Sequence, residues 1–264
     1  MKTFVTTPFL SPLAALGAAA LLAVQAFGAP QIGDEDYVSA VSAPKEERTH
    51  YAVSLVFSYM ALADGKTTRG SAYLGNITEL ELDNAFMVMP ELAYDFSENV
   101  RLALSYSSIK VGTKNWNNHF GDGAAKLRGP LVRLDFRYPA YDGKLIPHAG
   151  AGAIFYNSSF DEDTSWKLGY SNYEAWRGSG FSSRTAFGKF RSIKIDNIVA
   201  PLVSLGVAYR PHPNWELDLS YVYTFCEPDC KFGYVNGKGV FGEMASGSFD
   251  FSSHGAALTL SYLF

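Results

Sequence analysis

The sequence of 264 residues contains few charged side chains and no strong excess of either sign. Charged residues make up 18% of the chain and the formal net charge is -4, so there is no sign of the basic surface that binds nucleic acid. After residue 27 the chain also lacks any run of about 18 or more apolar residues, as a membrane-spanning helix would require. If the mature protein lies in a membrane, it must therefore do so as a closed β-barrel, whose backbone groups are all paired.

Residues that bind metals or perform catalysis are sparse as well. The 5 histidines are scattered along the chain, so we expect no metal or cofactor site. Ser252, Ser253 and His254 are adjacent, but neighbours along a strand point to opposite faces. They do not reproduce the His-x-Ser arrangement of barrel enzymes that deacylate lipid A, and we expect no enzymatic activity.

The chain has only 2 cysteines, Cys226 and Cys230, in the sequence Cys-Glu-Pro-Asp-Cys. Two cysteines in a secreted chain most simply form one disulfide. A redox motif would normally be Cys-x-x-Cys, and two cysteines without nearby histidines make a poor zinc site. We therefore predict a Cys226–Cys230 disulfide that clips a loop.

The N-terminus has the pattern of a secretory signal peptide. Lys2 supplies a positive charge, residues 13–27 form an apolar run, and Ala26 offers a small residue for cleavage. An uncleaved anchor is the alternative, but the run is short for a spanning helix. We predict a signal peptide over residues 1–26 and a charged periplasmic lead-in over residues 27–48.

Aromatic residues are abundant, at 15%, and apolar residues recur at every second position in many segments. Side chains alternate between the two faces of a β-strand, so this pattern indicates strands with one apolar face. The predicted fold class for residues 49–264 is all-β, an eight-stranded antiparallel up-and-down transmembrane β-barrel. The predicted strands are 51–59, 85–96, 100–109, 130–138, 145–156, 198–210, 215–225 and 254–264.

The connections between these strands alternate in length. Long, polar connections at 61–84, 110–129, 157–197 and 226–250 alternate with short turns, as in bacterial barrels with short periplasmic turns and long outer loops. Aromatic residues gather at both ends of the apolar face, which is typical of the two girdles at a membrane surface. The inner girdle comprises Tyr51, Phe96, Tyr138, Tyr209, Trp215, Tyr262 and Phe264, and the outer one Tyr59, Phe86, Tyr106, Phe155, Tyr223 and Phe225.

The opposite, inward parity carries charges of both signs. The interior of an eight-stranded barrel is barely wide enough for side chains, so these groups should pair into a network that plugs the lumen. A gate of ion pairs that opens is the alternative. The predicted lumen charge network comprises Glu91, Asp95, Arg101, Arg133, Asp135, Arg137, Arg210, Glu216 and Asp218.

The longest connection, 157–197, is rich in aromatic residues among glycine and serine. It could bind a partner or a small ligand, or it could fold over the barrel mouth and pack on itself. The aromatic residues are Trp166, Tyr170, Tyr173, Trp176, Phe181, Phe187 and Phe190.

Three segments carry a resemblance to a known family. They are Ile146-Pro147-His148-Ala149-Gly150-Ala151-Gly152, the strand Pro90-Glu91-Leu92-Ala93-Tyr94-Asp95-Phe96 before a Ser-Glu-Asn turn, and the closing Leu258-Thr259-Leu260-Ser261-Tyr262-Leu263-Phe264. Together they resemble the small eight-stranded outer-membrane proteins, most of all the OmpW family and then OmpA-like and OmpX-like barrels. The resemblance covers residues 49–264.

The resemblance to OmpW implies a bacterial outer-membrane protein with a narrow, apolar internal path, a passive conduit for small hydrophobic solutes. The charged inward parity departs from that picture and favours a non-conducting barrel that acts through its outer loops, in adhesion or envelope stability. The expected partners are outer-membrane lipids and lipopolysaccharide, a small hydrophobic ligand, and the barrel assembly machinery, which in that family recognises a closing strand with a terminal aromatic residue such as Phe264.

Overall fold

The computed structural model describes residues 50–63, 68–70, 77–82, 86–115, 121–168, 189–236 and 238–264. The predicted signal peptide and periplasmic lead-in lie outside these residues, as do Tyr170, Tyr173, Trp176, Phe181 and Phe187 of the aromatic connection. Among the described residues, no helix is long and apolar enough to cross a membrane.

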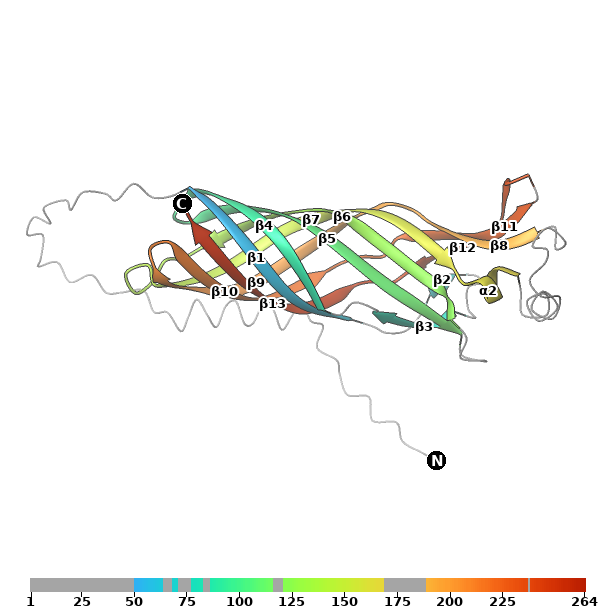
Figure 1. The fold of residues 1–264 in the computed structure, drawn as a ribbon, viewed down its shortest axis with the longest axis horizontal. Coiled ribbons are helices and arrows are strands. Elements are labelled where there is room, and N and C mark those ends of the chain that lie inside the picture. The colour runs from blue at the N-terminus through green and yellow to red at the C-terminus, as the bar shows by residue number, and fades with distance from the viewer. Residues whose placement is uncertain are drawn as a thin grey trace, which may run out of the picture. The chain divides into compact units, whose positions relative to one another are not determined.

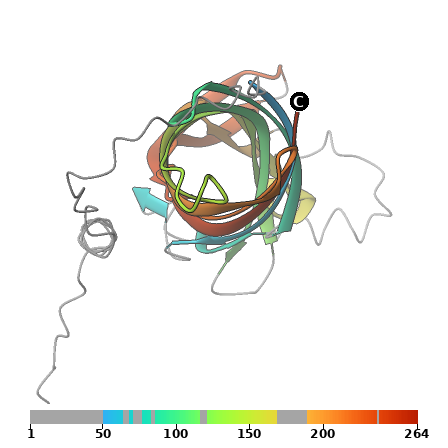
Figure 2. The same ribbon diagram turned by 90° about the vertical axis from the view of Figure 1, so that its left-hand side faces the viewer.

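Eight antiparallel strands close into a barrel (Figure 2), which confirms the predicted fold class. Each strand pairs with the next, and the last pairs with the first, with Leu260 opposite Leu55. Closure leaves no strand of the ring with an unpaired edge, which a lipid environment requires. The strands are β1 (Tyr51–Leu62), β4 (Phe86–Ser97), β5 (Val100–Asn115), β6 (Gly121–Arg137), β7 (Leu145–Glu162), β9 (Ile198–His212), β10 (Trp215–Thr224) and β13 (Ser253–Leu263).

The exterior of the barrel is the apolar face that the alternation predicts. Along β1, Val53, Leu55 and Phe57 are exposed while Ser54 and Val56 between them are buried. The residues of both predicted aromatic girdles are exposed too, except Tyr223, which is only partly exposed. An apolar, outward-facing belt on a closed barrel is stable only in lipid, so the barrel spans a membrane.

The three connections at the end that carries the C-terminus are short, as predicted. They are the turn at 98–99, the segment 138–144 and the turn at 213–214. The second of these reverses direction through Tyr141, Asp142 and Gly143, whose φ angles of 51°, 57° and 76° all lie in the left-handed region. Phe264 closes this end, since its N–H donates to the Tyr51 carbonyl at 3.1 Å.

At the opposite end of the barrel, strands β5, β6 and β7 extend further than predicted. The β5–β6 and β6–β7 ladders continue to Gly123, which pairs with Thr113 and Glu162. The alternation of apolar and polar residues weakens there because the outward residues no longer face lipid. The backbone hydrogen bonds between strands do not depend on that alternation and continue. A short strand, β3 (Ile77–Leu82), extends the wall further by pairing with β5.

The long connections predicted as polar loops also contain regular structure. Four strands from them form a second antiparallel sheet, in the order β2 (Thr68–Gly70), β12 (Phe241–Phe249), β11 (Asp229–Asn236) and β8 (Lys189–Ile195). A five-residue helix, α2 (Thr164–Leu168), contacts β8 and β6. In Figure 1, β8 and β11 lie beyond the end of the barrel opposite to the C-terminus.

Candidate functional site

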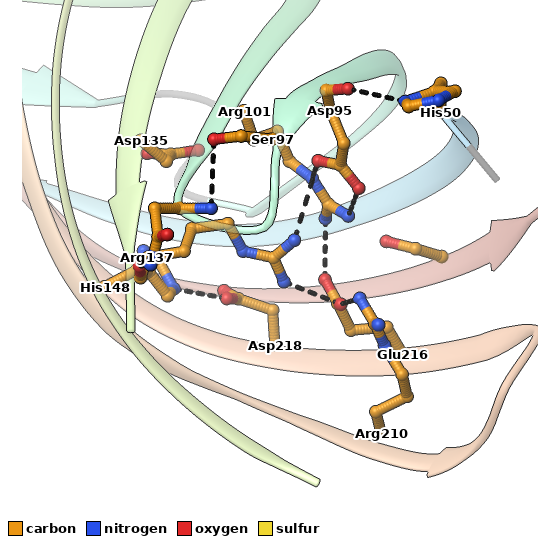
Figure 3. Close-up of polar contacts among 12 residues, drawn as sticks. His50, Asp95, Ser97, Arg101, Asp135, Arg137, His148, Arg210, Glu216 and Asp218 are labelled. Carbon is orange, nitrogen blue, oxygen red and sulfur yellow. Dashed lines mark hydrogen bonds and ion pairs between the residues drawn. The ribbon is translucent and has the colours of Figure 1, made fainter. Parts of the chain in front are cut away.

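Charged side chains meet inside the barrel close to the short turns. Glu216, on β10, accepts a hydrogen bond from Arg101 Nη1 at 2.6 Å, from Arg137 Nη2 at 2.6 Å and from Arg210 Nη2 at 2.8 Å. The three arginines come from β5, β6 and β9, so one carboxylate ties together three other strands (Figure 3). Asp95 of β4 holds Arg101 from the other side, through Nε at 2.6 Å and Nη2 at 2.8 Å. We call these five residues the hub group.

A second set, the inner group, lies next to the hub group: four of its members are two to four residues further along β4, β6 and β10, and His148 comes from β7. It comprises Glu91, Arg133, Asp135, His148 and Asp218. Arg133 Nε lies 2.9 Å from an Asp135 oxygen, and its Nη2 lies 3.7 Å from Glu91 Oε2. His148 Nε2 contacts Asp218 Oδ2, as Figure 3 shows. All five are largely screened from solvent, and Glu91 is 5% exposed.

The structure therefore brings all nine residues of the predicted charge network into the lumen, distributed over the two groups. His148 is the member that sequence reasoning left out, because it was treated as an isolated histidine. The signal that could have identified it is parity, since it shares the inward face of β7 with Gly150 and Gly152.

Glycines make room for the inner group. A Cβ at Gly150 would collide with Asp135 Oδ1 and lie 2.5 Å from Ser204 Oγ, and one at Gly206 would lie 2.6 Å from His148 Nε2. The Gly-rich sequence of β7, which suggests a close neighbour, thus leaves space for buried polar side chains.

Beyond the inner group the lumen changes character and becomes an apolar cavity. The cavity has a volume of about 50 Å³ and is partly open. Glu91 and Arg133 border it, and no member of the hub group does. Serine and threonine hydroxyls contribute to one part of the wall, while the apolar part comprises Val56, Met60, Met87, Met89, Leu131, Ile154, Leu202 and Val222.

An aromatic cluster fills the end of the barrel on the side of the cavity away from the inner group. Phe160 of β7 stacks on Phe249, with ring centroids 6.3 Å apart, and contacts Trp166 of α2 edge-on. Trp166 in turn contacts Phe232 of β11. Tyr156 belongs to the same core and its hydroxyl lies 3.0 Å from Ser107 Oγ at the cavity wall. For its described part, the aromatic connection thus packs onto the barrel mouth.

Sequence reasoning missed the cavity because it treated the inward parity as uniformly polar. On β5 the inward residues run from Arg101 and Ala103, through Ser105 and Ser107, to Ile109 and Val111. The polarity therefore changes along β5, from charged to small polar to aliphatic. This gradient is visible in the sequence once the strands are extended beyond the lipid-facing part.

The predicted disulfide is wrong, because Cys226 and Cys230 are both free and buried in the structure. Cys230 lies in the β11 ladder, opposite Ile195 and Gly247, whereas Cys226 precedes the strand and its carbonyl accepts from the Phe251 N–H at 2.8 Å. Both belong to the apolar core of the outer end. Burial raises the pKa of each thiol to about 12, with Asp250 and Asp229 adding to the effect, so both side chains behave as small apolar groups.

Neither a protein family nor a curated protein matches the sequence. Solved structures, however, match most of it. OprG from Pseudomonas aeruginosa is similar with a TM-score of 0.57 and 12% identity, over 82% of this chain and 96% of that one. The outer-membrane protein AlkL gives 0.53 and 15%, over 88% and 97%. Outer membrane protein W of E. coli gives 0.51 and 12%, over 83% and 100%.

The chain has the fold of the small eight-stranded outer-membrane barrels. Its apolar belt and this fold together place the barrel in the bacterial outer membrane, as the sequence predicts. In an outer-membrane barrel the short turns lie on the periplasmic side, so the hub group faces the periplasm and the aromatic cluster faces the cell exterior.

Proposed function

We propose that this outer-membrane barrel is an OmpW-like passive conduit that takes up small apolar solutes from the cell exterior. The observation that supports this most is the apolar cavity in the outer half of the lumen, since such cavities bind small molecules mainly through apolar contact. A solute in it meets the inner and hub groups on the periplasmic side. Complete passage therefore requires their ion pairs to open.

The composition of the cavity wall also supports this proposal. Three of the 5 methionines of the chain, Met60, Met87 and Met89, border the cavity. Methionine is flexible and polarisable, and it adapts to ligands of different shape. The wall thus suits a range of apolar solutes better than a single tightly recognised one.

A cavity-filling variant tests this function. Ala257 of β13 faces the cavity, and Ala256 beside it faces lipid. We expect Ala257→Phe to slow the uptake of the neutral fluorophore N-phenyl-1-naphthylamine by bacteria that produce the barrel, because the added ring occupies the solute's space. Ala256→Phe is the matched control and should behave like the wild type. Equal uptake by all three, at the rate of cells without the barrel, would count against the conduit.

The alternative function is that of a non-conducting barrel whose outer part contacts a partner or stabilises the envelope. Two observations favour it: the hub group joins five strands across the lumen, and the outer connections form their own four-stranded sheet. If the fluorophore test is negative, deletion of β11 and β12 followed by assays of cell adhesion and detergent sensitivity would separate these roles.

A further inference from the structure

The charges at the base of the apolar cavity are not balanced, and the imbalance bears on which solute the cavity selects. In the hub group, three arginines face the two carboxylates Asp95 and Glu216, which leaves an excess of one positive charge. The inner group has three carboxylates and one guanidinium, which leaves an excess of two negative charges. Protonation of His148 would reduce that excess to one without removing it.

The inner group, which carries the negative excess, is the one that meets the cavity. Glu91 borders both the polar space around the two charged groups and the apolar cavity, and its side chain is 6% exposed. Among the described residues, its only ion-pair partner within 4 Å is Arg133, at 3.7 Å. Arg133 is itself held more closely by Asp135, at 2.9 Å. Glu91 therefore keeps unused capacity to accept a hydrogen bond from a donor in the cavity.

Several buried polar atoms in and around the inner group have no hydrogen-bond partner among the described residues. They are Asp218 Oδ1 and His148 Nδ1 within the group, and the hydroxyls of Ser204 and Ser220 beside it. Buried polar atoms are normally paired. Asp218 borders the same polar space as Glu91, so its unpaired oxygen adds to the acceptor capacity at the base of the apolar cavity. Because Arg133 is already engaged by two carboxylates, an anionic ligand would find no free cation here and would meet the negative excess.

We propose that the cavity selects apolar molecules that carry one positive charge, such as alkyl or arylalkyl ammonium ions, and binds them with the nitrogen directed towards Glu91. The apolar body of the ligand lies among Met60, Met87 and Met89, and the ammonium group donates to the Glu91 carboxylate. A charge-assisted hydrogen bond in a water-poor cavity is stronger than a neutral one. The bound cation also favours the ionised form of Glu91. This proposal rests on the proposed function, since it names the class of solute that the conduit takes.

Three competitors with the same hydrophobic body test the proposal: phenylpropylamine, phenylpropanol and phenylpropionate. Each is titrated as a competitor of N-phenyl-1-naphthylamine against the full barrel in nanodiscs of zwitterionic phosphatidylcholine, with protein-free nanodiscs as the blank. We expect the amine to bind about tenfold or more tightly than the carboxylate, with the alcohol between them. Glu91→Gln should weaken the amine by about tenfold and leave the alcohol within about twofold, which also shows that the variant is folded.

Asp161→Asn is the matched control, because it removes one negative charge from the exposed outer surface and should leave the order of the three ligands unchanged. If the alcohol binds but the amine binds no more tightly, or if Glu91→Gln does not affect the amine, the charge selectivity is overturned while the conduit stands. If neither the fluorophore nor any of the three ligands binds beyond the blank, both proposals are overturned.

Discussion

The hub group makes a sharp prediction about stability. In Glu216→Gln the side chain keeps its size but loses the charge that three guanidiniums share, and Asp95 alone must then compensate Arg101, Arg137 and Arg210. Three charge-assisted hydrogen bonds at 2.6 to 2.8 Å are weakened at once. At 1.5 to 3 kcal/mol each their simple sum would be roughly 5–9 kcal/mol, but relaxation and water recover part of it. Breaking a buried ion pair costs about 3–5 kcal/mol, and we expect a value in that range.

The assay is equilibrium unfolding by urea of the barrel refolded in lipid vesicles, followed by tryptophan fluorescence and extrapolated linearly to zero denaturant. The exposed pair of Lys126 and Asp161 provides the control, and Asp161→Asn should cost less than about 1 kcal/mol because water already screens that pair. The double variant Glu216→Gln, Arg137→Gln should recover part of the loss, since it also removes one of the uncompensated cations.

A free energy of unfolding for Glu216→Gln within about 1 kcal/mol of the wild type would refute the reasoning. It would mean that the three arginines are already solvated by water in the lumen and that the hub group does not act as a unit. Additivity of the two substitutions in the double variant would lead to the same conclusion, because independent sites show no coupling energy.

Three further predictions concern other parts of the barrel. The double variant Arg133→Ala, Arg137→Ala should show small conductance steps in planar bilayers where the wild type is silent, because the ion pairs that fill the lumen are broken. Silence of both proteins would contradict closure of the lumen by these charges. Cys226 and Cys230 should resist alkylation near neutral pH in the folded barrel, since thiols with a pKa of about 12 stay protonated until the pH approaches that value, and both should react after unfolding. Mass spectrometry of the unfolded, alkylated protein measures this, and a product that gains no label would show that the disulfide forms after all. Phe264→Ala should lower the heat-modifiable, folded fraction recovered from outer membranes, because it removes the terminal ring that packs on the preceding aromatic residue of β13; an unchanged fraction would argue against a role in assembly.

Several features of this protein follow from the sequence alone. The period of two along each strand determines which side chains face lipid, because a slip of one residue would turn Leu55 or Leu260 into the lumen. The short turns and the even number of strands determine that the start of the first strand and the end of the last strand lie on the same side of the membrane. The inward position of the charged residues also follows from parity, although not their pairing.

The tertiary structure alone decided which charges meet. Glu216 and Arg101 are 115 positions apart, and their contact depends on how far each strand is staggered against the next when the sheet closes. A single sequence does not specify that stagger. The same applies to the division of the charges into a positive hub group and a negative inner group. That division depends on the level of each residue along the barrel axis, which its position along its own strand does not determine.

The outer half of the molecule was the least predictable part. Beyond the lipid the outward residues are free of the apolar requirement, so the periodic signal fades while the ladders of β5, β6 and β7 continue. Cys226 and Cys230 illustrate the consequence. Their spacing suggests a bridge, but the backbone pairing of β11 and the aromatic core around it place them as separate buried thiols. The sequence thus determined the membrane-spanning wall, where lipid imposes one rule on every second residue, and the tertiary structure decided the interior and the outer end, where contacts between distant strands replace that rule.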